Sequence, residues 1–126
     1  MSDAADELLK LNQQLLESIA AGDWATYSKL CDPTITAIEP EGRGHLIEGM
    51  PFHKFFFDLG PSKSPRTTTM SSPHVRVMGD VAVLSYVRLV QSVGADGPVI
   101  SSSEETRVWE KQQGKWQHVH FHRSPC

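Results

Sequence analysis

Three arginines occupy positions that a β-sheet normally fills with apolar side chains. Arg88 alternates with Tyr86 and Arg123 alternates with Phe121, so each pair shares one face of a predicted strand. Arg107 has the same kind of position in the strand between them. A charged side chain on such a face needs a partner. If the three guanidinium groups converge, their planar, bidentate donors suit a small anion such as a carboxylate or a phosphate.

The same arginines could instead have a purely structural role, in ion pairs with glutamates. Ion pairs would satisfy the guanidinium groups without any ligand, because burial of a charge ordinarily demands such pairing. The candidate partners are Glu39, Glu48, Glu104 and Glu105. The residues alone leave the anion site and the structural ion pairs equally open.

Histidines raise the question of a metal site. His118, His120 and His122 alternate along the last predicted strand. Neighbouring imidazoles on one strand face lie roughly 6 to 7 Å apart, so two of them could share an ion only with further ligands. We therefore predict a half-exposed sheet face, suited to a subunit interface, and expect no metal and no cofactor. For His53 the residues favour packing among aromatic neighbours over a donor that faces a cavity.

Signatures of nucleophilic and phosphoryl-transfer enzymes are absent from the sequence. It contains no G-x-S-x-G elbow, no P-loop and no kinase glycine-rich or catalytic loop, so this chain cannot by itself be a kinase. General acid and base chemistry by His53, Tyr86 and a carboxylate remains open, because it requires only positioned groups with tuned pKa values.

Composition indicates a single globular domain over residues 1–126, with 39% hydrophobic and 21% charged residues. The net charge of -3 gives no electrostatic reason to expect nucleic acid or an anionic membrane as partner. The acidic N-terminus lacks the bases of a signal peptide, and no apolar run approaches the roughly 20 residues that span a bilayer. Because Cys31 and Cys126 are too few for a disulfide framework, we expect a cytoplasmic protein with reduced thiols.

Helical periodicity and capping residues predict three helices in the first half of the chain. A small hairpin, with strands at 34–39 and 45–48, is predicted between the second helix and the third. The predicted helices are a long one capped by Ser2 or Asp3 and ended by Gly22, a short one from Asp23 to about Cys31, and one with an aromatic face from Pro51 to about Leu59.

The second half of the chain predicts four strands in an antiparallel meander, after a Pro- and Ser-rich loop at residues 60–66. Pro73 indicates an edge strand or a bulge, and the strand at 81–90 is apolar on both faces, which predicts a central strand covered on both sides. Helices followed by strands favour an α+β domain in which the long helix packs on a curved sheet. Such a sheet leaves a concave mouth where small ligands bind.

Several segments together resemble the association, or hub, domain of calcium/calmodulin-dependent protein kinase II, which has the nuclear transport factor 2-like fold. The similarity extends from the first helix to Ser124, and its most specific segments are SYVRLV, SEETRVW, GKWQ and VHFHRS. The resemblance implies a cone in which three helices pack in a strongly bent antiparallel sheet. It also implies a non-catalytic scaffold that assembles into a large ring, a dodecamer or tetradecamer or larger.

In that family the pocket of the cone is lined by arginines and binds small carboxylates. The matching positions are Arg88, Arg107 and Arg123, with His53 at the position of the family's pocket histidine. With Tyr86 on the same face as Arg88, we expect these five residues to bind the ligand. The resemblance further implies possible partners for hub co-assembly, the kinase II subunits themselves.

Two departures from the family bear on this expectation. The family carries a longer loop with a tryptophan after the aromatic helix, and here Leu59 leads into a shorter loop, which bears on the lid of the pocket. No kinase or calmodulin-binding segment precedes the first helix, so we expect a stand-alone hub homologue or part of a longer protein. The alternative function is a small enzyme of the same fold, an isomerase, dehydratase or cyclase acting on an anionic substrate.

Overall fold

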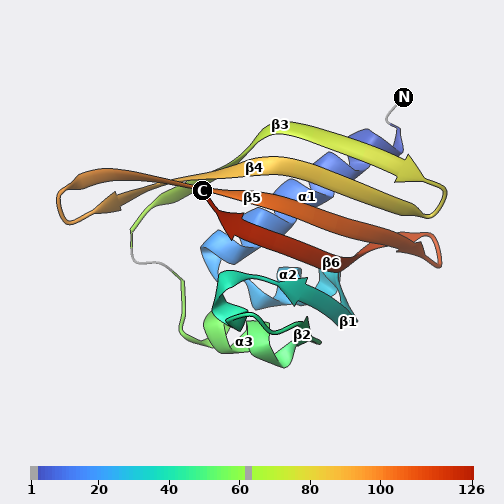
Figure 1. The fold of residues 1–126 in the computed structure, drawn as a ribbon, viewed down its shortest axis with the longest axis horizontal. Coiled ribbons are helices and arrows are strands. Elements are labelled where there is room, and N and C mark those ends of the chain that lie inside the picture. The colour runs from blue at the N-terminus through green and yellow to red at the C-terminus, as the bar shows by residue number, and fades with distance from the viewer. Residues whose placement is uncertain (1–2, 62–63) are drawn as a thin grey trace.

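A long helix lies across one face of a six-stranded sheet in the computed structural model, which describes residues 3–61 and 64–126 (Figure 1). The helix α1 (Ala4–Ala21) begins where the Asp3 side chain accepts the Asp6 N–H at 2.9 Å. It ends at Gly22, which adopts the left-handed conformation with φ 68°. The predicted long helix is therefore confirmed. The alternative cap, Ser2, lies outside the described residues.

The other elements follow the predicted order of two short helices, a small hairpin and four long strands. Cys31, which we expected near the end of the second helix, instead begins a strand, because the backbone is already extended there at φ -100° and ψ 141°. The elements are α2 (Trp24–Leu30), β1 (Cys31–Ile38), the 3-10 turn η1 (Pro40–Gly42), β2 (Ile47–Glu48), α3 (Pro51–Asp58), β3 (Arg66–Met78), β4 (Val81–Gly94), β5 (Gly97–Gln112) and β6 (Lys115–Pro125). The predicted loop at 60–66 includes residues 62–63, which lie outside the described ranges.

The sheet has the strand order β2-β1-β6-β5-β4-β3. Strands β3 to β6 form the predicted antiparallel meander. One pairing departs from the expected antiparallel sheet, because β1 lies parallel to β6, with Thr36 beside His120 and Ala37 beside Phe121. A parallel pair needs a long connection, and the whole meander supplies it here. Through this pairing, β1 and its neighbour β2 extend the sheet beyond β6, the last strand of the chain.

The edge strand β3 contains the irregularity that Pro73 predicts. The pairing of β3 with β4 shifts between Ser71 and His74, and Ser72 has a φ of 51°. Proline cannot donate to the strand ladder, so it is tolerated at such an edge and bulge.

A second irregularity overturns the predicted histidine row. The pairing of β5 with β6 shifts between Val108, which faces His120, and Trp109, which faces His118. An extra residue at a bulge inverts the alternation of side chains along a strand. His118 is therefore fully buried, whereas His120 is only partly buried. The prediction that the three histidines share one half-exposed face is wrong.

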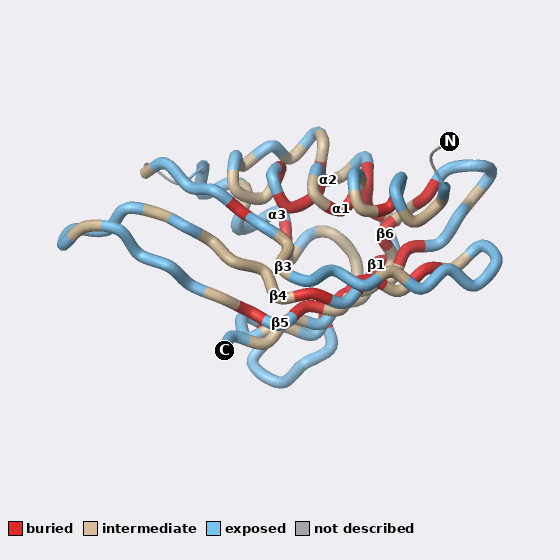
Figure 2. Tube along the Cα trace, turned by 90° about the horizontal axis from the view of Figure 1, so that it is seen from above, coloured by how far each residue is buried: buried red, intermediate tan, exposed pale blue. Residues whose placement is uncertain are grey.

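Buried residues gather where the helices and the sheet face each other (Figure 2). On β4, Leu84 and Tyr86 are buried against this core, but Val83 and Val87 on the opposite face are only half-buried. In the single chain, the prediction that this strand is covered on both faces is therefore wrong, because the helices pack on only one face of the sheet. Within residues 3–61 and 64–126, no helix has both the length and the apolar character to cross a membrane.

The β4–β5 hairpin extends beyond the part of the sheet that α1 covers (Figure 1). Its end is exposed, and Ile100 keeps 68% of its surface accessible. The concave face of the sheet therefore continues from the core onto the projecting, solvent-exposed β4–β5 hairpin.

Candidate functional site

Glu105 lies at the centre of the buried polar network on the concave face. Its side chain is 0% exposed, and its carboxylate accepts the Tyr86 hydroxyl at 2.6 Å. It also pairs with Arg88 Nη1 at 3.3 Å and with Arg107 Nη2 at 3.0 Å. Burial alone would raise the pKa of Glu105, but the two guanidinium groups and the Tyr86 hydrogen bond lower it to about 2. One carboxylate is thus shared by two predicted site arginines.

Arg107 is held almost entirely by the protein itself, since only 1% of its side chain is exposed. Its Nε donates to the Tyr86 hydroxyl at 2.9 Å and to Glu105 at 3.1 Å. The guanidinium carbon lies 4.4 Å from the centre of the Phe121 ring, a cation–π contact. Burial disfavours its charged form, but Glu105 together with Tyr86 and Tyr27 outweighs burial, so the pKa of Arg107 is raised. Most of its donors are therefore already in use.

Asn12 of α1 joins this network and was missed by the sequence analysis. Its amide donates to the Tyr86 hydroxyl at 3.0 Å and accepts the Trp109 indole N–H at 3.1 Å. The signal that could have revealed it is its position four residues after Leu8, inside the apolar stripe of the helix. A buried polar residue there requires partners on the sheet.

His118, brought inward by the bulge, packs beside Arg107. Arg107 Nη1 lies 3.4 Å from His118 Nε2, and Cys31 Sγ lies 3.4 Å from Nδ1. Because arginine has no acceptor, Nε2 accepts and the proton resides on Nδ1, which faces the thiol. Burial, and then Arg107, lowers the pKa of His118, so the imidazole is neutral. The role of His118 is to support Arg107.

Arg123 lies nearer the mouth and has different partners. Its Nη2 is 3.4 Å from Glu39 Oε1 and also contacts Glu41 Oε1. The side chain stays 21% exposed. Burial, and then the neighbouring Glu41, raises the pKa of Glu39. Two carboxylates of the chain therefore already contact Nη2 of Arg123.

His53 approaches the same group from α3. Its Nδ1 lies 3.6 Å from Glu39 Oε2. Burial, and then Arg107, lowers the pKa of His53 to about 4, so the imidazole is neutral at pH 7 and its contact with Glu39 carries no full ion pair. Its buried Nε2 has no hydrogen-bond partner among the described residues.

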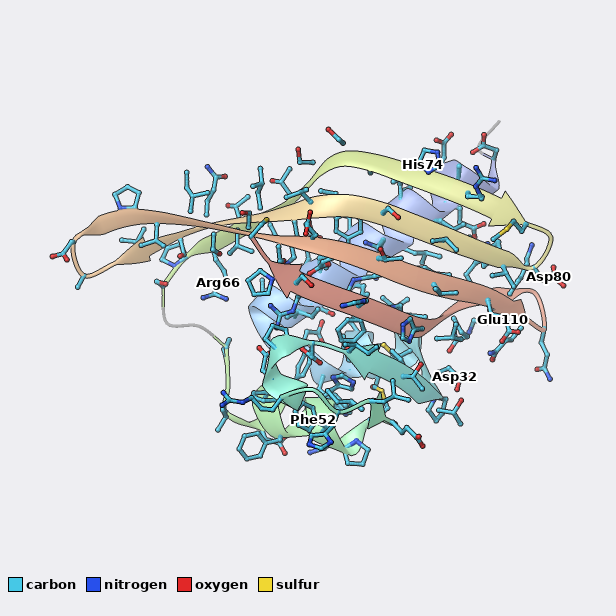
Figure 3. All side chains as sticks on the ribbon, in the orientation of Figure 1. Asp32, Phe52, Arg66, His74, Asp80 and Glu110 are labelled. Carbon is cyan, nitrogen blue, oxygen red and sulfur yellow. The ribbon has the colours of Figure 1, made fainter. Side chains whose placement is uncertain are left out.

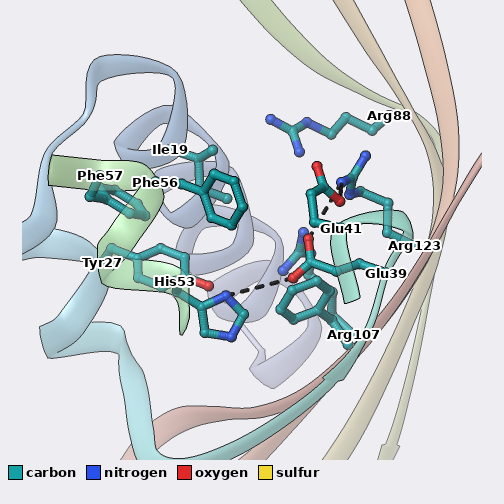
Figure 4. A pocket seen from close by; sticks show the side chains of 11 residues that line it. Ile19, Tyr27, Glu39, Glu41, His53, Phe56, Phe57, Arg88, Arg107 and Arg123 are labelled. Carbon is teal, nitrogen blue, oxygen red and sulfur yellow. Dashed lines mark hydrogen bonds and ion pairs between the residues drawn. The ribbon is translucent and has the colours of Figure 1, made fainter. Parts of the chain in front are cut away.

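These side chains surround a cavity of about 270 Å³ (Figure 4). It combines the four predicted residues Arg88, Arg107, Arg123 and His53 with an apolar wall from the helices and β6. The fifth predicted residue, Tyr86, does not line it and instead holds Arg107 and Glu105 from behind. The lining residues are Ile19, Tyr27, Glu39, Glu41, His53, Phe56, Phe57, Arg88, Arg107, Phe121 and Arg123.

The structural ion pairs of the arginines are present, and they occur beside a cavity. The predicted partners Glu39 and Glu105 form ion pairs, whereas Glu48 and Glu104 have no ion pair within the described ranges. Glu41 was not predicted as a partner, because it comes from a 3-10 turn that strand alternation does not describe. The three arginines nevertheless line a cavity, so an arginine can form an ion pair within the chain and still face the cavity.

Comparison with known proteins agrees with this architecture. Residues 4–126 match the family described as "Calcium/calmodulin dependent protein kinase II association domain". The chain belongs to this family. Over 122 residues it is 50% identical to the rabbit (Oryctolagus cuniculus) calcium/calmodulin-dependent protein kinase type II subunit delta. The match covers 94% of this chain but 23% of the rabbit kinase, so the chain corresponds to about a quarter of that relative.

Solved structures extend the comparison to the fold. The calcium/calmodulin-dependent protein kinase II hub homology domain of Chlamydamonas reinhardtii is 51% identical, with a TM-score of 0.93 over 98% of this chain and 99% of that one. A nuclear transport factor 2-like protein from Cytophaga hutchinsonii is 17% identical, with a TM-score of 0.80 over 99% of this chain and 100% of that one. The association-domain family thus has the nuclear transport factor 2-like fold that the resemblance implied.

Proposed function

We propose that this chain is a non-catalytic oligomerisation domain that assembles into a large ring and binds a small carboxylate in the arginine-lined cavity of each subunit. The observation that carries the proposal is the association-domain match over residues 4–126. We propose a dodecamer, a tetradecamer or a larger ring of identical chains, with kinase II subunits as possible partners through co-assembly.

Exposed apolar side chains support the self-association. On α3, Phe55 is 62% exposed, and Leu59 directly after the helix is 71% exposed. Ile100 and Val99 are exposed on the projecting β4–β5 hairpin. Large apolar side chains gathered on a surface mark contact sites between proteins.

We expect a molar mass of at least twelve times the 14.0 kDa of one chain, measured by multi-angle light scattering at micromolar protein concentration. Native mass spectrometry then gives the number of subunits. Mixing with full-length kinase II subunits should produce rings that contain both chains. A monomer or a dimer at these concentrations would contradict the scaffold function.

The carboxylate proposal rests on the donors that remain at the mouth of the cavity. Arg88 uses Nε on Thr68 and Nη1 on Glu105, which leaves Nη2 without a protein partner within the described ranges. Arg123 contacts its two glutamates through Nη2. The unused nitrogens of both side chains can hold a planar carboxylate, while the aromatic wall accepts an apolar tail.

Acetate should raise the melting temperature of the assembly by a few degrees at saturation, because binding stabilises the folded state. Arg123→Ala should abolish this shift. Glu41→Gln should strengthen acetate binding by roughly two- to fivefold, since it removes an exposed internal competitor for Arg123. Arg76→Ala, an exposed arginine on β3 far from the cavity lining, is the matched control. Equal acetate shifts in all four proteins would place the carboxylate site elsewhere.

A further inference from the structure

A second cavity, of about 260 Å³, lies on the concave face beside the first. Arg88 and Arg123 line both cavities. Arg66, which lies at the start of β3 (Figure 3), lines the second one. No aspartate or glutamate is among its described lining residues, in contrast to the first cavity. The lining residues are Arg66, Arg88, Val90, Ser92, Ser101, Ser102, Ser103, Arg123 and Pro125.

Strand register explains why these polar groups converge. Arg88 pairs with Ser103 across β4 and β5, and Arg66 pairs with Ser92 across β3 and β4. Ser101 lies two residues before Ser103, so alternation places it on the same face. The hydrogen-bond donors therefore come from four neighbouring strands and surround a hollow.

The charges around this cavity are not balanced. Arg88 is shared with Glu105, and Arg123 with two glutamates of the first cavity. Arg66 is exposed and has no ion-pair partner among the residues that the structure describes. The charge of Arg66 thus remains without a counter-charge among the described residues, in a wall that is rich in hydroxyl and guanidinium groups.

We propose that this second cavity binds the phosphoryl group of a small phosphate monoester. A phosphoryl group presents acceptor oxygens in three dimensions, which suits donors arranged around a hollow, whereas a carboxylate presents two oxygens in one plane. Ser92 and Ser101 can each donate their one hydroxyl hydrogen to such an oxygen, whereas the Ser103 hydroxyl already donates to Glu105 at 3.4 Å. The site is distinct from the carboxylate cavity in its hydroxyl wall and in Arg66, although Arg88 and Arg123 contribute to both.

The test uses the assembled protein and thermal unfolding with inorganic phosphate and with glycerol 3-phosphate. Both should raise the melting temperature more than sodium chloride at equal ionic strength. Arg66→Ala should lose most of this shift, and Ser101→Ala should reduce it. Arg76→Ala, another exposed arginine on the same strand, should keep it. Isothermal titration calorimetry of the same variants should show at least a tenfold weaker phosphate affinity for Arg66→Ala.

Acetate separates this proposal from the carboxylate cavity, because Arg66 does not line that cavity. An Arg66→Ala protein that keeps its acetate shift and loses its phosphate shift supports two sites. If the phosphate shift depends on Arg66, the phosphate proposal would be supported even when acetate binds to none of the variants. Phosphate shifts that are equal in Arg66→Ala and Arg76→Ala, or equal to those of sodium chloride, would overturn the proposal.

Discussion

The position of Glu105 explains how the protein buries two arginines beside a cavity. A buried guanidinium group is stabilised only when its charge and its donors are satisfied. Glu105 meets this need for Arg88 and Arg107 together, and Tyr86 completes the hydrogen bonds. Because the donors of Arg107 are nearly all in use, Arg107 orders the cavity wall, and the donors proposed for a ligand come from Arg88 and Arg123.

Glu105→Gln should destabilise the fold by about 3–5 kcal/mol, because it leaves Arg88 and Arg107 without their shared counter-charge. Urea unfolding at pH 7 measures this loss. Glu104→Gln, which changes an exposed neighbour, is the control. A loss below about 1 kcal/mol would show that the charge of Glu105 is not needed.

The same carboxylate predicts a pH dependence. The folded pKa of Glu105 is about 2, below its ordinary value of 4.5, so its charge stabilises the fold fully above pH 4.5. This stabilisation is lost as the pH falls from 4.5 toward 2. Urea midpoints between pH 7 and pH 3 should therefore fall less steeply in Glu105→Gln than in the native protein. Parallel pH curves would contradict the assigned pKa.

Alternation along strands placed Arg88, Arg107 and Arg123 each on the apolar face of its own strand, and its limits explain what was missed. Whether the three guanidinium groups converge was left open by alternation, and the family resemblance supplied the common cavity. Alternation failed for His118, because a bulge inverts the faces and leaves no mark in the local residue pattern. It could not find Glu41, which reaches Arg123 from a turn.

The end of α1 lies in close contact with the segment that follows α3. Gly22 has a φ of 68°, and a Cβ built there would lie 3.1 Å from the backbone nitrogen of Pro61. This position therefore requires both a left-handed conformation and the absence of a side chain. The contact between Gly22 and Pro61 positions the end of α1 relative to the segment that follows α3.

Gly22→Ala should cost more stability than Gly44→Ala, although both positions have positive φ. The left-handed conformation alone costs an alanine roughly 1–2 kcal/mol. The contact with Pro61 adds to this cost at Gly22, whereas a Cβ at Gly44 would meet nothing within 4 Å. Urea unfolding of the two variants measures the difference, and equal losses would show that Pro61 moves aside freely.

The order of the elements and the antiparallel pairing of β3 to β6 were predictable, but the pairing of β1 with β6 was not. Periodicity and caps identified the helices, and turn residues separated the four long strands. The parallel contact of β1 with β6 has no local signal, since both strands alternate in the same way whichever neighbour they have. The resemblance to the association-domain family supplied the overall fold, which periodicity alone leaves as one α+β arrangement among several.

For the whole molecule, the curved sheet creates one continuous concave face that contains both cavities. The helices close one part of this face and leave the β4–β5 hairpin uncovered (Figure 2). Binding in either cavity would involve Arg88 and Arg123, so the two proposed ligands would influence each other through shared charge. The half-buried outer side of β4 and the exposed hairpin remain as surface for other copies of the chain.

The parallel pairing of β1 with β6 also has a consequence for how the chain folds. Thr36 and His120, which contact each other, are separated by 84 residues, and Cys31 and His118 by 87. Closing so large a loop directly is entropically unfavourable, but each hairpin of the meander shortens the remaining separation. We expect strands β3 to β6 to pair with one another first. Strand β1, which Glu39 directly follows, would then pair with β6 late, so the first cavity would be among the last features to form.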